Sequence, residues 1–335
     1  MGAGASTDFI HHDNQVVSDD LIPPLANDLF NKRFESIISQ FKEMRPLPGN
    51  IATALRQGIS LEAYLQDVKK IAATNEDRQR QLIALEFYLQ KLFYEISLRF
   101  GSQSGNNYDS LVGYINDYIH TYKEKVHVVS FNYDTLFEQS LPSKYSFKQA
   151  MDYLNNDISI YKVHGSWNWK YILPDLTGWI REAGGSYPYM MESPWSLTHQ
   201  PKEYFEGRDL IITDSLSYND TYGDREYYYC PAIAVPLPGK DSFICPPSHV
   251  QMLQTALGMT DNILIIGWKA GDQALIEMIK QFVNIPAKIT IASRNSGSAI
   301  EDVLSGKGNL TFTTTQHTLS TFLGSKECLS FFKLN

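Results

Sequence analysis

The sequence predicts an α/β protein whose core is a Rossmann-like, doubly wound parallel sheet. From residue 125 onward, short β-branched runs recur, and several are apolar throughout, which is typical of strands covered on both faces by helices. A helical pattern at 273–282 separates two of the later runs, and alternation of this kind indicates a parallel sheet. The predicted strands are 126–131, 158–163, 232–235, 262–267, 288–293 and 310–315.

The segment before these strands, residues 27–125, is predicted to be a helical insertion. Residues 74–77 resemble a capping box and begin the clearest helix, which Gly101 ends. A second amphipathic helix follows around residues 111–119. The apolar face of the first helix recurs at steps of three and four and consists of Leu82, Leu85, Leu89, Phe93, Ile96 and Phe100.

A second, irregular insertion is predicted at 171–229. This stretch is rich in Tyr, Trp, Pro, Gly and Asp and lacks clean periodicity. The remaining segments, 1–26, 126–170 and 230–335, then form one Rossmann-like domain that the two insertions interrupt.

Composition excludes several classes of protein. No run of about 18 apolar residues is present, so a spanning helix is excluded, and without a signal-peptide pattern we expect a cytoplasmic protein. The net charge of −8 without a basic run argues against nucleic acid as a direct partner. The three cysteines are widely spaced and form no C-x-x-C pair. We therefore expect no disulfide framework, no zinc ribbon and no metal.

Candidate site residues follow the predicted strands directly. In doubly wound sheets, ligands bind at the carboxyl ends of the strands. An amide, an imidazole, a carboxylate and small-residue turns would therefore converge on one crevice if the strands are adjacent. These residues are Asn132 and Asp134 after 126–131, His164 after 158–163, Gly267 and Trp268 after 262–266, and Ser293 and Asn295 after 288–292.

Each of these polar residues also has a structural interpretation. Asn132 and Asp134 are equally explained as turn and N-cap residues of a following helix. A buried structural role for His164 is as well supported as a catalytic one. For Asp272, before the helix at 273–282, the N-cap interpretation is favoured.

The N-terminal stretch MGAGAS supports two interpretations. With Met1 removed, Gly2 fits an N-myristoylation acceptor, whereas the small residues fit a loop that approaches a phosphate. A single acyl chain needs a second, polybasic signal for stable anchoring, and the segment that follows is acidic. The phosphate-loop interpretation is therefore favoured, with no membrane attachment.

Taken in chain order, the motifs resemble those of a known family. GAGAS, S-F-N-Y-D, K-V-H-G, I-I-G-W and I-A-S-R-N follow one another as they do in the sirtuin (silent information regulator) family. Within that family the sequence is most similar to prokaryotic effectors of antiphage defence. The resemblance covers 1–9, 126–170 and 230–315 in pieces.

The resemblance implies an NAD site and assigns residues to it. Asn132, His164 and Asp134 would be catalytic, with Asn132 and Asp134 on the nicotinamide-ribose side and His164 facing the same ribose. NAD would be the substrate rather than a resident cofactor. Matched to the motifs, the binding residues would be Gly2, Ala3, Gly4, Ala5 and Ser6 with Asp8 and Phe9, then Gly267 and Trp268, and Ser293 and Asn295.

The implied activity is hydrolysis of NAD⁺ to nicotinamide and ADP-ribose, controlled by a partner protein or by homo-oligomerisation. Alternatives are an NAD-dependent deacylase, an ADP-ribosyl transferase, a non-catalytic sensor of NAD or ADP-ribose, and a myristoylated scaffold. Sirtuin deacylases carry a four-cysteine zinc ribbon, which this sequence lacks, so deacylation is disfavoured. In the family a strand precedes GAGAS. We therefore expect either a start upstream of Met1 or another means of holding the loop.

Overall fold

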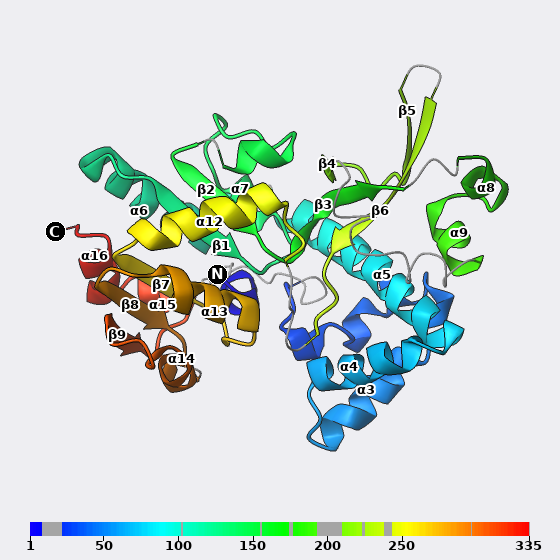
Figure 1. Cartoon of the computed structure of the whole chain (residues 1–335), viewed down its shortest axis with the longest axis horizontal. Coiled ribbons are helices and arrows are strands. Elements are labelled where there is room, and N and C mark those ends of the chain that lie inside the picture. The colour runs from blue at the N-terminus through cyan, green and yellow to red at the C-terminus, as the bar shows by residue number, and fades with distance from the viewer. Residues whose placement is uncertain are drawn as a thin grey trace.

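The chain is an α/β protein in which helices cover parallel strands, as predicted. The computed structural model describes residues 1–8, 22–101, 103–154, 156–173, 177–192, 210–222, 225–237, 243–295 and 297–334. Figure 1 shows two lobes, with the parallel strands in one and an antiparallel sheet with long helices in the other. The N-terminus lies in the middle of the molecule, beside β1 and α13.

The parallel strands fall into two groups that the N-terminus joins. β1 pairs with β2, and β8 lies between β7 and β9. All five predicted runs that form these strands are confirmed. Their bounds are β1 (Val126–Ser130), β2 (Ile158–Lys162), β7 (Asn262–Ile266), β8 (Ala287–Ala292) and β9 (Leu310–Thr315).

Met1 and Gly2 connect the facing edges of β1 and β7. The amine of Met1 donates to the carbonyl of Val129 at 2.6 Å, and the N–H of Phe131 donates to the carbonyl of Met1 at 3.0 Å. On the other side, the N–H of Gly2 donates to the carbonyl of Ile266 at 3.0 Å. The strands therefore follow the order β2, β1, Met1–Gly2, β7, β8, β9, and their carboxyl ends share one edge.

Helices pack around this parallel core. Most of the GAGAS stretch lies in a five-residue helix rather than an open loop, with Gly2 extended before it. The predicted helix at 273–282 is confirmed, and the carboxylate of Asp272 caps it by accepting from the N–H of Leu275 at 2.9 Å. The helices are α1 (Ala3–Thr7), α6 (Asn107–Tyr122), α7 (Leu136–Gln139), α12 (Pro247–Met259), α13 (Gln273–Phe282), α14 (Gly297–Leu304), α15 (Leu319–Leu323) and α16 (Lys326–Phe331).

The second lobe contains an antiparallel sheet, which corrects one strand prediction. The run 232–235 was expected in the parallel sheet, but its first residues end β6, which pairs antiparallel with β3. The carboxyl end of β6 thus lies beside the start of β3, where Ile233 is opposite Gly165. Within the insertion predicted at 171–229, the described residues include the end of β3, all of β4 and β5, the first part of β6, and two short helices. The strands run in the order β4 (Leu210–Ile212), β3 (Gly165–Ile172), β6 (Arg225–Ile233) and β5 (Asn219–Tyr222).

Helices complete the second lobe. The predicted start of the long helix and its apolar stripe are confirmed, but the capping box is not, because only the Asn75 side chain caps α5. Asn75 caps α5 by accepting from the N–H of Arg78 at 3.0 Å. Of the predicted stripe, Leu82 is partly buried and the others are fully buried, because α5 packs on β3, β6 and α9. The helices are α2 (Glu35–Ile38), α3 (Leu47–Arg56), α4 (Leu61–Ala72), α5 (Glu76–Phe100), α8 (Thr177–Glu182) and α9 (Ser186–Glu192).

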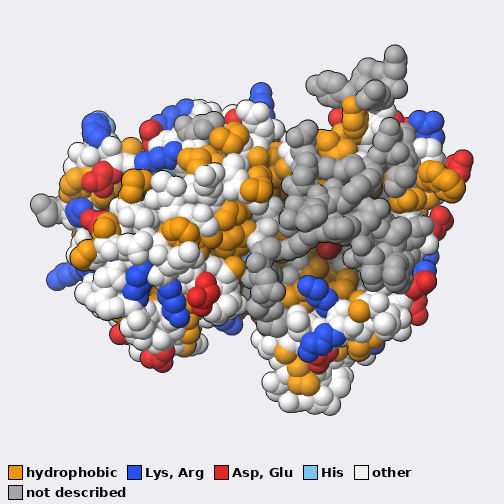
Figure 2. Space-filling view, viewed as in Figure 1, with side chains coloured by type: hydrophobic (Ala, Val, Ile, Leu, Met, Phe, Trp, Pro, Cys, Tyr) orange, Lys and Arg blue, Asp and Glu red, His pale blue; other side chains and the backbone are white. Residues whose placement is uncertain are grey.

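The described surface shows no feature of a membrane span. No helix among the described residues is long and apolar enough to cross a bilayer. On the face in Figure 2, positively and negatively charged side chains of the described residues are interspersed with hydrophobic ones.

The turn after β7 requires glycine where it meets the N-terminus. Gly267 has a φ of +63°, and a Cβ atom on it would lie 2.4 Å from the N atom of Ala5. A Cβ atom on Gly2 would lie 2.4 Å from the carbonyl oxygen of Gly267. The two backbones therefore approach more closely than any side chain allows.

We predict that Gly267→Ala lowers the melting temperature, because it adds both a left-handed alanine and a backbone clash. Left-handed strain alone costs about 1–3 kcal/mol. Gly271→Ala is the matched control, since a Cβ atom there meets no atom within 4 Å. Thermal unfolding followed by circular dichroism measures both variants. Equal melting temperatures for the two would contradict the close approach.

Candidate functional site

The carboxyl ends of β1, β2 and β7 gather side chains from distant parts of the sequence. Asn132 follows β1, His164 follows β2, and Gly267 follows β7. The Met1–Gly2 connection holds the first two strands beside the third, so these residues lie around one edge of the core.

A histidine–aspartate pair is the most polar feature of this edge. The Nε2 atom of His164 lies 2.6 Å from Oδ2 of Asp272, and their side chains are 12% and 3% exposed. The other carboxylate oxygen of Asp272 caps α13. The favoured N-cap interpretation was therefore correct but incomplete, because each oxygen has a separate role. The signal in the sequence was the position of Asp272 just beyond the Gly267 turn.

Aromatic rings line the site beside this pair. The ring of Phe131 stacks on Trp268 with centroids 5.3 Å apart and an interplanar angle of 9°. It also meets the imidazole of His164 edge-on at 5.1 Å. Phe131 was not singled out from the sequence, although it lies between β1 and Asn132. The imidazole therefore packs against an aromatic ring on this side.

A buried hydrogen-bond network joins α1 to the turn after β1. The Nδ2 atom of Asn132 donates to Oγ of Ser6 at 2.8 Å and to the hydroxyl of Tyr108 at 3.3 Å. Ser6 and Tyr108 lie 2.9 Å apart, and Ser6 also hydrogen-bonds to the carboxylate of Asp134. The Oδ1 atom of Asn132 is buried without a hydrogen-bond partner among the described residues. Tyr108, in the first turn of α6, was missed because it lies before the amphipathic pattern that predicted this helix.

Burial governs the ionisation of the groups in this network. Burial raises the pKa of Asp134, while Lys162 and the hydrogen bond from Ser6 act in the opposite direction. Burial and the nearby Asp134 carboxylate raise the pKa of the Tyr108 hydroxyl, so this side chain stays protonated. The Asp134 carboxylate also accepts from the N–H of Leu136 at 3.2 Å, so it fixes the turn from inside.

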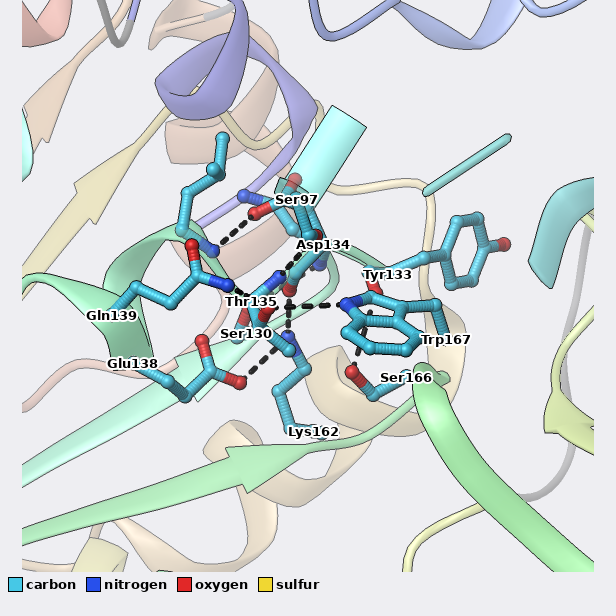
Figure 3. A network of polar contacts seen from close by, with 12 residues as sticks. Ser97, Ser130, Tyr133, Asp134, Thr135, Glu138, Gln139, Lys162, Ser166 and Trp167 are labelled. Atoms are coloured by element: carbon cyan, nitrogen blue, oxygen red, sulfur yellow. Dashed lines mark hydrogen bonds and ion pairs between the residues drawn. The ribbon is translucent and has the colours of Figure 1, made fainter. Parts of the chain in front are cut away.

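A buried lysine holds the same turn from below, as Figure 3 shows. Lys162, at the end of β2, is fully buried and forms an ion pair with Glu138 at 3.0 Å. Its ammonium group also donates to the carbonyl of Asp134. Thr135 of this turn accepts from Trp167 Nε1 at 3.1 Å, and its N–H donates to Ser97 at 3.1 Å. Side chains of α5, β2 and β3 thus fix the turn that carries Asn132.

The remaining N-terminal candidates are tied to the rest of the protein by backbone hydrogen bonds and by burial. The N–H groups of Gly2 and Gly4 donate to the carbonyls of Ile266 and Gly267 at 3.0 and 3.3 Å. Ala3 is partly buried, and Ala5 is fully buried. The carboxylate of Asp8 accepts from the N–H of Ser320 at 2.6 Å, at the start of α15. Phe9 lies outside the described residues.

The last predicted pair lies one strand away from this cluster. Ser293 follows β8, and its N–H donates to the carbonyl of Thr315 at 3.2 Å. Asn295 is exposed two residues later. Both lie at the carboxyl edge of the sheet, after β8, which is on the side of β7 away from β1.

The described residues contain no cluster of side chains that could bind a metal ion. Among the described residues, no three His, Cys, Asp or Glu side chains gather closely enough to hold an ion. Cys230, Cys245 and Cys328 are free thiols, and all three are buried.

We predict that Lys162→Met destabilises the protein by about 3–5 kcal/mol, because it leaves the buried Glu138 carboxylate without its cation. Burial raises the pKa of Glu138, and the nearby Lys162 ammonium group is the largest influence that opposes this rise. Protonation relieves an unpaired buried carboxylate, so the deficit relative to the parent should shrink as the pH falls from 8 to 5. Urea unfolding at several pH values measures this. The double variant Lys162→Met/Glu138→Leu should recover much of the loss, and a double variant no more stable than the single one would contradict the ion-pair account.

Comparison with solved structures finds matches, whereas comparison with protein families and curated proteins does not. The chain is similar to a crystal structure of a Sir2 homolog–NAD complex, with a TM-score of 0.41 and 11% identity over 98% of both chains. This similarity is weak, and the pairing of the parallel strands by itself establishes the α/β class of the chain.

Proposed function

We propose that the protein is an NAD⁺ glycohydrolase that cleaves NAD⁺ to nicotinamide and ADP-ribose. The observation that carries the proposal is the convergence of the His164–Asp272 pair, Asn132 and α1 at the carboxyl edge of the parallel strands. The sequence motifs that resemble the sirtuins supply three of these four features. The fourth, Asp272, comes from the structure.

One feature of the site favours a bound ribose over a purely structural role for Asn132. Asn132 keeps a buried acceptor oxygen without a partner among the described residues, and such an atom is costly unless a ligand satisfies it. A ribose hydroxyl is a donor of the required kind. The amide itself is held by Ser6 and Tyr108, so the acceptor is already oriented before a ligand arrives.

The reaction needs little acid assistance. When the bond between the ribose C1′ and the nicotinamide nitrogen breaks, its electron pair stays on nitrogen and neutralises the pyridinium charge, unlike in O-glycosides. Water then forms the new bond to C1′ and releases one proton. The protein must orient the ribose, stabilise positive charge on the sugar and accept that proton.

In this proposal His164 accepts the proton, directly or through a ribose hydroxyl. Asp272 accepts from its Nε2–H, which fixes the tautomer, leaves the basic lone pair on Nδ1 and stabilises the imidazolium that forms. Asn132 orients the ribose and the water. Asp134 holds the turn that carries Asn132 and is a positioning residue. The α1 segment and the Gly267–Trp268 turn would contact the rest of NAD, with Ser293 and Asn295 nearest its adenosine ribose.

A role in bacterial antiphage defence is part of the proposal and rests on the sequence resemblance. Consumption of NAD is toxic to the host, so such an enzyme must stay inactive until a signal arrives. A partner protein or homo-oligomerisation would supply this control. Incubation with and without the product of the neighbouring gene separates an enzyme that a partner activates from one that is active alone.

We predict that Asn132→Ala and His164→Ala each slow NAD loss by roughly 10²–10⁴-fold, the usual contribution of general-base and orienting groups. Chromatography of nicotinamide released by the purified proteins measures the rates. Asn50→Ala and His120→Ala are matched controls, because both residues are exposed and distant in sequence from the site. If either site variant consumes NAD at the parental rate, the role given to that residue is wrong.

Asp272→Asn separates the two roles of that carboxylate. An asparagine still caps α13, so the melting temperature should stay within about 1 °C of the parent. It presents an amide to His164 and disfavours the required tautomer, so the rate should fall by roughly 10²–10⁴-fold. A variant that loses stability but keeps its rate per folded molecule would show that Asp272 is only a cap.

A further inference from the structure

The first turn of α6 brings a tyrosine hydroxyl into the buried network that holds Asn132. Tyr108 is fully buried, and its hydroxyl oxygen lies 3.3 Å from Nδ2 of Asn132 and 2.9 Å from Oγ of Ser6. Tyr108 belongs to the segment 27–125, which the sequence predicted only as a helical insertion. The insertion therefore contributes a side chain to the candidate site.

The start of α6 is fixed by its own cap and by a bond to α1. The side chain of Asn106 accepts from the N–H of Asp109 at 2.9 Å, and the Asp109 carboxylate accepts from the N–H of Asn106 at 3.2 Å, which is a capping box. Asn107 donates from Nδ2 to the carbonyl of Asp8, where α1 ends. Consecutive residues of α6 thus hold α1 at Asp8 and at Ser6.

The aromatic ring of Tyr108 is held separately from its hydroxyl. The ring meets that of Phe137 edge-on, with centroids 5.7 Å apart and an interplanar angle of 86°. Phe137 belongs to α7, which begins directly after the turn that carries Asn132. Removal of the hydroxyl oxygen alone should therefore leave this packing in place.

The Asp134 carboxylate sets the direction of the hydrogen bonds in the network. While Asp134 is ionised it can only accept, so the single hydroxyl hydrogen of Ser6 goes to this carboxylate. The Ser6 oxygen must then accept in its contact with Tyr108, and the hydrogen of Tyr108 fills that bond. The Tyr108 oxygen retains lone pairs and accepts from Asn132.

Two acceptors consequently face the same end of the Asn132 amide. Only the NH₂ end can bond to both Ser6 and Tyr108, because in the opposite orientation Oδ1 would meet two oxygens whose hydrogens are already used. With Ser6 alone, one N–H of the buried amide would lose its acceptor, which is costly. The Tyr108 hydroxyl thus completes the arrangement that turns Oδ1 away from the network.

We propose that Tyr108 is a positioning residue that fixes the side-chain amide of Asn132, so that Oδ1 is presented to the ribose. The catalytic consequence rests on the proposed function, whereas the orientation of the amide is a property of the protein alone. In this role Tyr108 acts through Asn132 and not on NAD⁺ itself. The helical insertion is thereby part of the site.

Nuclear magnetic resonance of the side-chain amide tests the orientation without NAD⁺. The two Nδ2 protons of Asn132 are identified by their absence from the spectrum of Asn132→Ala. In Tyr108→Phe, which keeps the ring, we expect one of the two protons to exchange with solvent about ten-fold or more faster, because it has lost its acceptor. Exchange of both protons at the parental rate in Tyr108→Phe overturns the proposal.

Tyr114→Phe is the matched control for this variant. Tyr114 lies on the same helix, and its hydroxyl donates to the carbonyl of Leu323 at 3.0 Å, away from the network. Its removal also deletes one hydroxyl and one hydrogen bond, but it should leave both Asn132 protons unchanged. Faster exchange of the Asn132 protons in the control as well would show a general loosening of α6 and overturn the specific role of Tyr108.

Kinetics test the consequence for the proposed reaction. Tyr108→Phe should lower kcat by about ten-fold, the effect of one hydrogen bond on a rate, and change KM by less than about two-fold. In an Asn132→Ala background the same change should have no further effect, because Tyr108 then has no amide to hold. Tyr114→Phe should keep the parental kcat. A similar ten-fold loss in the Asn132→Ala background would show that Tyr108 does not act through Asn132, and overturns the proposal.

The two measurements separate failure of this inference from failure of the proposed function. If the parent protein leaves NAD⁺ intact, the glycohydrolase proposal fails, and amide exchange still decides whether Tyr108 holds Asn132. If the parent cleaves NAD⁺ while Tyr108→Phe keeps the parental kcat and amide exchange, only the role of Tyr108 is wrong.

Discussion

The pairing of Met1 and Gly2 with the ends of β1 and β7 is the constraint on which the rest of the site depends. Without these bonds the strands form two separate groups, β1–β2 and β7–β8–β9. His164 follows a strand of the first group, while Asp272 follows a strand of the second. Their contact at 2.6 Å therefore requires the N-terminus to hold both groups at one spacing. The glycines at 2 and 267 permit this, because no side chain fits between the backbones.

The second requirement is a rigid turn after β1. Asn132 can present an oriented amide only if residues 132–135 keep one conformation. Lys162 and Glu138 stabilise that turn from inside the core, and Thr135 is bonded to α5 and β3. Buried charges are expensive, and their retention here is consistent with a positioning role rather than with stability alone. The turn is thus built by residues that need never touch a substrate.

The parallel strands could be predicted because apolar β-branched runs and the helix at 273–282 carry a local signal. The direction of β6 could not be predicted, because an apolar run indicates that a strand is buried but not which strand it pairs with. Asn132 and His164 were found by their position after strands. Asp272 was assigned only a cap, and Tyr108 was not singled out, because each makes its decisive contact with a residue more than 100 positions away in the sequence. A single sequence indicates such long-range contacts only where a known motif contains them. For Asp272, its role as the cap of α13 was a sufficient explanation, so its contact with His164 was not predicted.

The central claim is that these residues direct water to the ribose of NAD⁺. Incubation of the purified protein with NAD⁺ in isotopically labelled water tests this most directly, with mass spectrometry of the products and the neighbouring gene's product present in a parallel sample. The account predicts nicotinamide and ADP-ribose in equal amounts, with one labelled oxygen on the ribose of each ADP-ribose. Unchanged NAD⁺ in both samples would contradict the account. ADP-ribose attached to protein or to an acyl group, without labelled oxygen at the ribose C1′, would contradict it as well.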